Sequence, residues 1–345
     1  MPRRTQLSFA SCNLYNLNLP GLPVYSDSDG WSAEVYARKV AWSARMIASV
    51  DSDVWGFQEL WHPQALTELF QAAGLEGEYD LLTPAGHAGE SIVCGGAVRK
   101  GILVGAPEWL EEFPERFRLD SGGDDNQTGE IGISIDRFSR PLLHFRIRPR
   151  ANGKVISVYV AHLKSKAPSK LYREGWYRAD KDYYSRHSAA LGAAVSTIRR
   201  TAEATALRMI LTEEMKNNDN PVVVLGDLND SQHSNTLNIL TGQPRYLLSG
   251  LTKGGSDTAL YTAGTLQEYR SLRDVYYTHI HQNIRESLDH ILVSQEFYDN
   301  SRRRLWAFKG MALFNDHLND GDHRENGSSD HGVVRAAFEY RPVRD

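Results

Sequence analysis

The stretch PVVVLGDLND, residues 221–230, is the part of the sequence that decides the fold. Its first half, Pro221–Leu225, is a valine-rich apolar run of the kind that forms a strand buried on both faces. Gly226 then permits a tight exit, and the polar residues Asp227 and Asn229 follow. Loops that leave a rigid buried strand are where α/β folds place reacting groups. The stretch therefore predicts a buried strand that delivers Asp227 and Asn229 to a candidate site.

The same arrangement, a polar side chain next to an apolar strand, recurs along the chain. Each case alone has an ordinary explanation, because a strand-terminal Asp or Asn is usually a turn former. A lone His is more often a hydrogen-bonded structural residue than a catalyst. The recurrence, together with two histidines, predicts one shared site. Its other candidate members are Asn13 at the end of the first strand, Glu59 in VWGFQEL, His162 after SVYVA, Asp289 in SLDHILVS, and Asp330 with His331 before the last strand.

Short β-rich runs are spread over the whole chain and are interrupted by helical patterns. Helices are predicted at Trp31–Val50, Pro63–Ala73 and His187–Lys216. One buried face is expected in the last helix, from Leu191, Val195, Ile198, Ala202, Ala206 and Met209. Strands are predicted at Leu7–Asn13, Val54–Phe57, Ser91–Val98, Glu130–Ile135, Leu142–Ile147, Val155–Ala161, Pro221–Leu225, Leu288–Val293 and Val333–Phe338.

The order of these elements has no strict βαβ rhythm, and hairpin-like strand pairs occur in the middle of the chain. Such an order favours an α/β (α+β) fold in which a mixed sheet system is covered by helices. The sequence has neither an internal repeat nor a Pro-rich or Ser-rich linker, so residues 1–345 are expected to form a single domain. The polar stretch Phe314–His331 is expected to be a solvated loop, since its His317 and His323 match no metal-ligand spacing.

Composition limits the classes of protein that fit. The 345 residues are 41% hydrophobic, enough for a sizeable core. The 39 Lys plus Arg against 43 Asp plus Glu give a net charge of -4, which excludes a global positive field but not a local basic patch. No apolar run approaches the roughly 18 residues of a membrane span. Cys12 and Cys94 lie in apolar strand-like stretches and are expected to be buried thiols, in a cytoplasmic protein without an obligate partner.

The predicted site combines carboxylates, an amide and two histidines at one sheet edge. These are the side chains that metal-assisted phosphoester hydrolysis uses. A hard divalent cation prefers oxygen ligands, which Glu59, Asp330 and the amide oxygen of Asn13 would supply. The cation would polarise a phosphoryl oxygen and neutralise the charge that develops in an in-line displacement. This chemistry leaves coordination positions for water and phosphate.

Proton transfer needs further groups. Either Asp227 or His331 could act as the base that activates water, and Asp289 is the natural partner to hold the imidazole of His331. His162 could donate to a non-bridging phosphate oxygen or protonate the departing alkoxide. Other catalytic mechanisms are not supported, because the motifs that they require are absent from the sequence: the P-loop, G-x-S-x-G, H-E-x-x-H and C-x-x-C.

The ordered set of motifs resembles the endonuclease/exonuclease/phosphatase family, the pancreatic-deoxyribonuclease-like superfamily. The resemblance runs from Asn13 to Val334, nearly the whole chain, and it is the combination that is specific. Its parts are Asn13, QE at Gln58–Glu59, HLKSK from His162, GDLN from Gly226, LDHILVS from Leu288 and SDH at Ser329–His331.

The resemblance implies a four-layer sandwich, with two mixed β-sheets face to face and helices outside. It implies that Glu59 and Asn13 bind Mg²⁺ or Mn²⁺ and that Asp330 assists the metal. It also implies that Asp227 and Asn229 position the attacking water or the phosphate, that Asp289 pairs with His331, and that His162 is the first catalytic histidine. Some members carry a Tyr or Arg phosphate clamp between the positions of Glu59 and His162, and the sequence does not locate it.

The substrate is the part of the function that the sequence determines least. The leading hypothesis is a metal-dependent phosphodiester hydrolase that acts as a nuclease on DNA or RNA. The segment Lys164–His187 mixes seven Lys or Arg with five Tyr or Trp, which could hold a nucleic acid strand, or could be a surface insertion packed on the sandwich. The alternative is a phosphatase or phosphodiesterase acting on a small-molecule or phospholipid-type phosphoester. A third interpretation is a catalytically inactive binding module. It is disfavoured because none of the candidate site residues is missing from the sequence.

Overall fold

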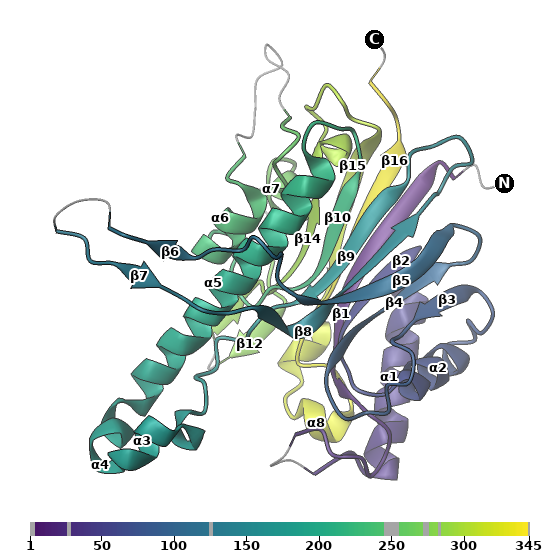
Figure 1. Cartoon of the computed structure of the whole chain (residues 1–345). Coiled ribbons are helices and arrows are strands. Elements are labelled where there is room, and N and C mark those ends of the chain that lie inside the picture. Colours follow the sequence, from purple (N-terminus) through teal and green to yellow (C-terminus); the bar gives the residue numbers. More distant parts are fainter. Residues whose placement is uncertain are drawn as a thin grey trace.

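The computed structural model describes residues 4–25, 29–123, 127–244, 255–271, 276–281 and 284–343. Two six-stranded sheets pack face to face (Figure 1). In spatial order the first sheet contains β15 (Trp306–Phe314), β16 (Val333–Tyr340), β1 (Gln6–Leu17), β2 (Val54–Leu60), β4 (Val93–Arg99) and β3 (Tyr79–Leu82). The second contains β11 (Tyr261–Thr262), β14 (Asp289–Val293), β10 (Val222–Asp227), β9 (Ile156–His162), β8 (Arg137–Ile147) and β5 (Leu103–Glu112).

Both sheets are mixed. In the first, β1 pairs in parallel with β2 and antiparallel with β16. In the second, β10 pairs in parallel with β9 and antiparallel with β14. Two hairpins form separate small sheets: β6 (Asp120–Ser121) with β7 (Ile131–Gly132), and β12 (His279–His281) with β13 (Ile284–Glu286).

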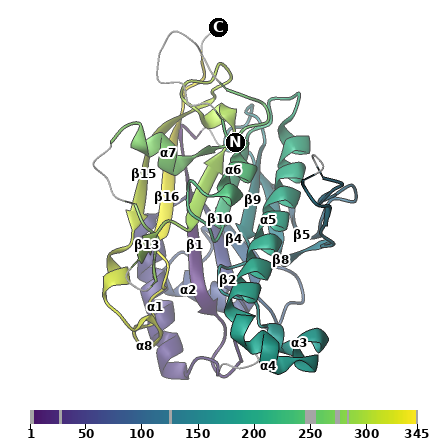
Figure 2. The same cartoon turned by 90° about the vertical axis from the view of Figure 1, so that its left-hand side faces the viewer.

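Helices cover the outer face of each sheet (Figure 2). Apolar side chains of α1 (Ala33–Val50) and α2 (Pro63–Ala72) share a core with the first sheet. Those of α5 (Ser188–Met215) and α6 (Asn235–Thr241) share another with the second sheet. The predicted four-layer sandwich is therefore confirmed. The shorter helices are α3 (Gly175–Ala179), α4 (Lys181–Tyr184), α7 (Ala263–Glu268) and α8 (His323–Asn326), with 3₁₀ turns at Leu171–Arg173, Ser185–His187, Gln295–Phe297 and Asp316–Asn319.

The alternation of side chains along β10 positions the candidate site. Val224 faces the helices of its own sheet, whereas Leu225 belongs to the core between the sheets. Asp227, two residues after Leu225, points to the same face as Leu225. The register places His162 of β9 and Asp289 of β14 directly opposite Asp227. These three residues therefore form one row at the end of the inter-sheet core.

The apolar face predicted for the long helix is buried only in its second half, and in the first half Gly192 and Ser196 are buried instead. Ala202 and Ala206 are buried, but Leu191, Val195 and Ile198 are exposed. The first half of α5, with α3 and α4, extends beyond the body of the sandwich (Figure 1). The prediction is wrong for this half because a helical period reports an apolar stripe and not the length of the surface that covers it.

Two further predictions are corrected by the structure. Only Ile131–Gly132 of the predicted strand Glu130–Ile135 is extended, in a projecting hairpin where Ile131 is 57% exposed and gains little from burial. The stretch Phe314–His331 is not a solvated loop throughout, because it contains a 3₁₀ turn and α8. Its His317 is buried, with Nε2 3.0 Å from the carbonyl oxygen of His331.

Cys12 and Cys94 are free and buried, as predicted. Burial raises the pKa of each thiol to about 12, so both are inert thiols at neutral pH. Among the described residues, no helix combines the length and the apolar character needed to cross a bilayer.

Gly226 should be intolerant of any side chain. A Cβ atom there would lie 2.1 Å from the carbonyl oxygen of Ala161 on the neighbouring strand β9. Gly226→Ala must therefore push β9 and β10 apart, and we expect a loss of about 1–3 kcal/mol in the free energy of unfolding, measured by urea denaturation. Gly132→Ala is the control, because its Cβ would have no heavy atom within 4 Å. Equal stability of the two variants would contradict the strand spacing.

Candidate active site

Asp227 is the centre of the candidate site. Its Oδ2 accepts a hydrogen bond from Nδ2 of Asn13 at 3.2 Å, and Nε2 of His162 lies 3.5 Å from the same oxygen. Its Oδ1 accepts the backbone N–H of Asn229 at 2.9 Å. Burial raises the pKa of Asp227 to about 7, against the lowering effect of the facing His331. A carboxylate with a pKa near neutrality is suited to exchange a proton with water.

His331 is held in a fixed orientation by Asp289. Its Nδ1 lies 2.8 Å from Oδ2 of Asp289, so its Nε2 faces Oδ2 of Asp227 at 3.9 Å. Burial opposes a charge on this imidazole, but Asp289 and Asp227 outweigh it and hold the pKa of His331 well above its ordinary value. The two carboxylates therefore favour the imidazolium form of His331.

The loop before His331 is tied to the first strand. Ser329 donates its hydroxyl to the carbonyl oxygen of Asn13 at 2.8 Å and accepts the backbone N–H of His331 at 3.0 Å. Both bonds are buried. The C-terminal Asp-His pair is therefore positioned against β1, on the sheet opposite Asp227.

Glu59 reaches the site through a break in the alternation of β2. Along this strand Phe57 belongs to the outer core, so Glu59, two residues later, would face outward in a regular strand. Instead, Glu59 has a positive φ of 57°, and the register with β4 shifts between Phe57 and Leu60. Such a bulge re-aims a side chain. Oε1 of Glu59 lies 4.0 Å from Nε2 of His162 as a result.

The turn that follows Asn13 positions Glu59. The backbone N–H of Asn16 donates to Oε2 of Glu59 at 3.0 Å. Asn16 is itself held by two indoles: Trp31 donates to its carbonyl oxygen at 2.7 Å, and Trp61 donates to its Oδ1 at 2.9 Å. Its φ of 57° is left-handed, a conformation that Gly and Asn tolerate best. Sequence reasoning did not identify Asn16.

The carboxylates of Glu59 and Asp330 are suitable ligands for a divalent cation. Burial raises the pKa of Glu59, and the negative charge of Asp330 raises it further. Two like charges at a buried position are stabilised when a cation lies between them. Asn13 fits this set less directly, because its amide oxygen already accepts the backbone N–H of Tyr15 at 2.9 Å and has one lone pair left.

The other predicted residues are also within the site. Burial lowers the pKa of His162 well below its ordinary value, and the charge of Arg140 lowers it further, so His162 is neutral. Asn229, with a left-handed φ of 53°, donates its Nδ2 to the carbonyl oxygen of Leu163 at 3.0 Å. This bond fixes the chain that leaves β9. All eight residues predicted from the sequence are thus brought together, and their catalytic roles remain predictions.

Two cations beside the site were missed. Arg140 on β8 acts electrostatically on both Glu59 and His162, and it donates to the carbonyl oxygen of Leu163 at 3.3 Å. Lys39 on α1 is buried with its ammonium 5.0 Å from the ring centre of Tyr15. Burial lowers the pKa of Lys39 to about 8, although Asp330 and Glu59 oppose this effect. A single Arg in a strand and a single Lys in a helix carry no sequence signal.

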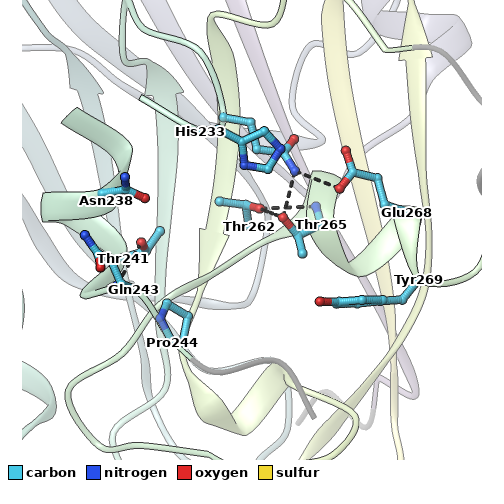
Figure 3. A pocket seen from close by; sticks show the side chains of 10 residues that line it. His233, Asn238, Thr241, Gln243, Pro244, Thr262, Thr265, Glu268 and Tyr269 are labelled. Carbon is cyan, nitrogen blue, oxygen red and sulfur yellow. Dashed lines mark hydrogen bonds between the residues drawn. The ribbon is translucent and has the colours of Figure 1, made fainter. Parts of the chain in front are cut away.

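A pocket elsewhere on the molecule has a different character (Figure 3). Its volume is about 470 Å³, and it is lined mostly by polar residues from α6, α7 and the segments next to these two helices. Its groups bond to one another: Nε2 of Gln232 donates to Oγ1 of Thr265 at 2.7 Å and to Oε2 of Glu268 at 3.1 Å. It contains none of the predicted site residues. This pocket is therefore separate from the row at the sheet ends.

The turn at Asn16 should control cation affinity. Asn16→Ala places a side chain that disfavours the left-handed conformation by about 1–2 kcal/mol, whereas Asn16→Gly does not. Both variants lose the bond from Trp61. We therefore expect Asn16→Ala to bind Mn²⁺ roughly 5–30-fold more weakly than Asn16→Gly in calorimetric titration. Equal affinities would mean that the turn does not position Glu59.

Comparison with known proteins gives the family. The sequence matches the Endonuclease/Exonuclease/phosphatase family over residues 15–331. No curated protein sequence matches the chain. Similar solved structures include an endonuclease/exonuclease/phosphatase from Bacteroides vulgatus, with 16% identity, a TM-score of 0.54, and 98% of this chain and 100% of that chain covered. The human Nocturnin catalytic domain with bound sulfate anion has 15% identity, a TM-score of 0.54 and coverages of 99% and 97%. D. rerio TDP2 complexed with single strand DNA product has 16% identity, a TM-score of 0.54 and coverages of 97% and 100%. The chain belongs to the endonuclease/exonuclease/phosphatase family.

Proposed function

We propose that the protein is a divalent-metal-dependent phosphodiester hydrolase and that its substrate is a nucleic acid. One observation carries the hydrolase proposal: His331, held by Asp289 at 2.8 Å, faces Asp227 beside the carboxylates of Glu59 and Asp330. Phosphoryl transfer to water requires a proton donor, a proton acceptor and a bound cation. The site offers an imidazolium, a carboxylate of near-neutral pKa and a cation-binding pair of carboxylates. The family match supports the phosphoester class.

In this proposal, Glu59 and Asp330, with the remaining lone pair of Asn13, hold Mg²⁺ or Mn²⁺. When bound, the cation polarises the phosphoryl oxygen and neutralises its developing charge. Oδ2 of Asp227 accepts the proton of the attacking water, since Asn13 holds this oxygen in place at 3.2 Å. The imidazolium of His331 donates from Nε2 to a non-bridging phosphate oxygen. As the water oxygen bonds to phosphorus, the bond from phosphorus to the leaving oxygen breaks, and the departing alkoxide takes a proton from solvent, to which Asp227 later returns the proton it accepted.

His162 and Arg140 complete the proposed machinery. The neutral imidazole of His162 can donate its N–H to the phosphate without adding a second buried charge. Arg140 acts on Glu59 and His162 from the side of β8, and it is our candidate for the phosphate clamp that the sequence left unlocated. Asn229 keeps the β9 exit in place through Leu163. We further propose that residues 1–345 act as one catalytic domain, in a reducing compartment such as the cytoplasm.

The nucleic-acid part of the proposal is supported by an arm, defined as residues 164–187. It carries seven Lys or Arg against three Asp or Glu in a chain of net charge -4. Tyr172, Trp176 and Tyr183 are 52%, 46% and 51% exposed. Exposed aromatic faces stack bases, and cations attract phosphates. The arm lies at the same end of the molecule as α8, which precedes Asp330 and His331 (Figure 2).

Two basic residues after the arm have structural contacts instead. Arg200 is buried, with Nε 3.4 Å from Oδ2 of Asp230. Arg208 donates to the carbonyl oxygen of Leu240 at 3.0 Å. The cationic surface that we assign to substrate binding is therefore the arm and not the whole of α5.

Hydrolysis of a small diester tests the hydrolase proposal. A bis-aryl phosphodiester should be cleaved faster than the matching monoester with Mg²⁺ or Mn²⁺, and cleavage should stop with a chelator. Asp227→Asn and His331→Ala should each lower kcat/KM by roughly 10²–10⁴-fold while leaving the circular dichroism spectrum unchanged. His233→Ala, an exposed histidine outside the site, is the control. Full activity of Asp227→Asn would overturn the site assignment, and a preference for the monoester would favour a phosphatase.

The arm should determine affinity for single strands. Each lost base stack costs about 1–3 kcal/mol, so the double variant Trp176→Ala/Tyr183→Ala should bind a single-stranded oligonucleotide at least about tenfold more weakly by fluorescence anisotropy. Turnover of the small diester should not change. Tyr269→Ala, which removes an aromatic side chain 47% exposed elsewhere, is the matched control. Equal oligonucleotide affinity in the double variant would direct the search to small-molecule or phospholipid-type esters.

A further inference from the structure

We propose that His279, Asp330 and His331 form a second cation site, for a transition metal such as Zn²⁺, and that its occupation stops hydrolysis. The inhibitory part of this inference rests on the proposed function, whereas the binding part does not. His279 lies on β12, outside the row of predicted residues, and sequence reasoning did not select it.

Geometry brings the three side chains together. One donor atom from each lies within 4.8 Å of the others. The backbones of His279 and His331 form an antiparallel β-bridge, and their ring centres are 4.8 Å apart. Beside the bridge, the backbone N–H of Gly332 donates to the carbonyl oxygen of Thr278 at 2.7 Å. The short β12–β13 hairpin therefore fixes His279 against the loop of the Asp-His pair.

Both imidazoles have a nitrogen to offer. Nδ1 of His279 is buried and has no hydrogen-bond partner among the described residues. A buried polar atom without a partner is costly, and an absent ion is one of the usual reasons for it. In His331, Nδ1 is taken by Asp289, so Nε2 is the donor, and zinc binding must first displace the proton that this nitrogen carries. Its nearest carboxylate oxygen, Oδ2 of Asp227, is 3.9 Å away.

The donor types select the cation. Two imidazole nitrogens and one carboxylate oxygen match the three protein ligands of many zinc sites, with a fourth position for water. Mg²⁺ prefers oxygen ligands, as in the set of Glu59, Asp330 and Asn13. Among divalent first-row metals, affinity for nitrogen donors is high for Zn²⁺ and Cu²⁺ and low for Mn²⁺. The two sites therefore differ in the metal that they prefer.

The two sites also compete, because they share a residue. Asp330 belongs to both, so a zinc ion on the three donors withdraws one carboxylate from the Mg²⁺ site. The same ion occupies Nε2 of His331, which then cannot donate to the phosphate. Zinc–ligand distances of about 2.0–2.2 Å place the donors of a tetrahedral site roughly 3.3–3.6 Å apart, so the three donor atoms, which lie within 4.8 Å of one another, must move closer when zinc binds.

Calorimetric titration with Zn²⁺ alone tests the binding part. The wild type should bind one zinc ion at this site, and His279→Gln should bind it at least about tenfold more weakly, as even outer-shell changes cost 10–100-fold. Glu59→Gln should retain the site, because Glu59 is not a ligand in it. His233→Gln is the control for loss of an exposed histidine. Equal zinc affinity of the wild type and His279→Gln, or loss of binding in Glu59→Gln, would overturn the proposal.

Activity measurements then test inhibition separately. In the presence of Mg²⁺, zinc should inhibit the wild type at concentrations near its measured Kd, and His279→Gln should require at least about tenfold more zinc relative to its own zinc-free rate. If zinc binds as expected but no diester is hydrolysed under any condition, the proposed function fails while the zinc site stands. If the diester is hydrolysed but zinc inhibits both proteins equally, the inhibitory site is wrong and the hydrolase stands.

Discussion

The pairing register of β9, β10 and β14 is the constraint on which the site depends. It sets His162, Asp227 and Asp289 side by side on the face that the second sheet turns toward the first. A slip of one residue in any of these pairings would move a whole strand of side chains to the other face. The apolar residues behind the row resist such a slip, because Val160, Leu225 and Ile291 would leave the inter-sheet core with it. The packing of the core thus holds the reacting groups in place.

The same burial gives the polar row its unusual protonation. Asp227 is 2% exposed among groups of both signs, and burial brings its pKa to about 7, while Asp289 and Asp227 keep His331 protonated. In water the same side chains would titrate near their ordinary values, with the carboxylates fully charged at pH 7. A low dielectric also strengthens each interaction, so small changes in geometry change the charge of the row. The protonation of the row therefore depends on its burial and on the charges that face one another within it.

Much of the fold and the site could be predicted from the sequence. Sequence patterns identified strands with apolar faces, such as β10 and β14, and the polar residues next to them. Buried strands are rich in apolar residues, so they can be recognised from composition. Edge strands were missed: β5 has no fully buried residue, only half-buried and exposed ones, and it mixes charged with apolar residues, so no period marks it. The bulge that turns Glu59 inward could not be read either, since it depends on pairing with β4. Glu59 was nevertheless selected as a candidate because its position after an apolar run was sufficient, and its role as a metal ligand stays a prediction.

Residues missed at the site share a physical reason. Arg140 and His279 act from elements whose placement depends on tertiary contacts, on β8 and on a short hairpin, and neither carries a local signal. The net charge of the chain and the charge of the arm also differ. The net charge of -4 repels a polyanion at long range, whereas the arm, with a surplus of four positive charges from seven Lys or Arg against three Asp or Glu, attracts it locally. Salt screens both effects beyond roughly 8–10 Å, so at physiological ionic strength the local attraction governs a bound strand.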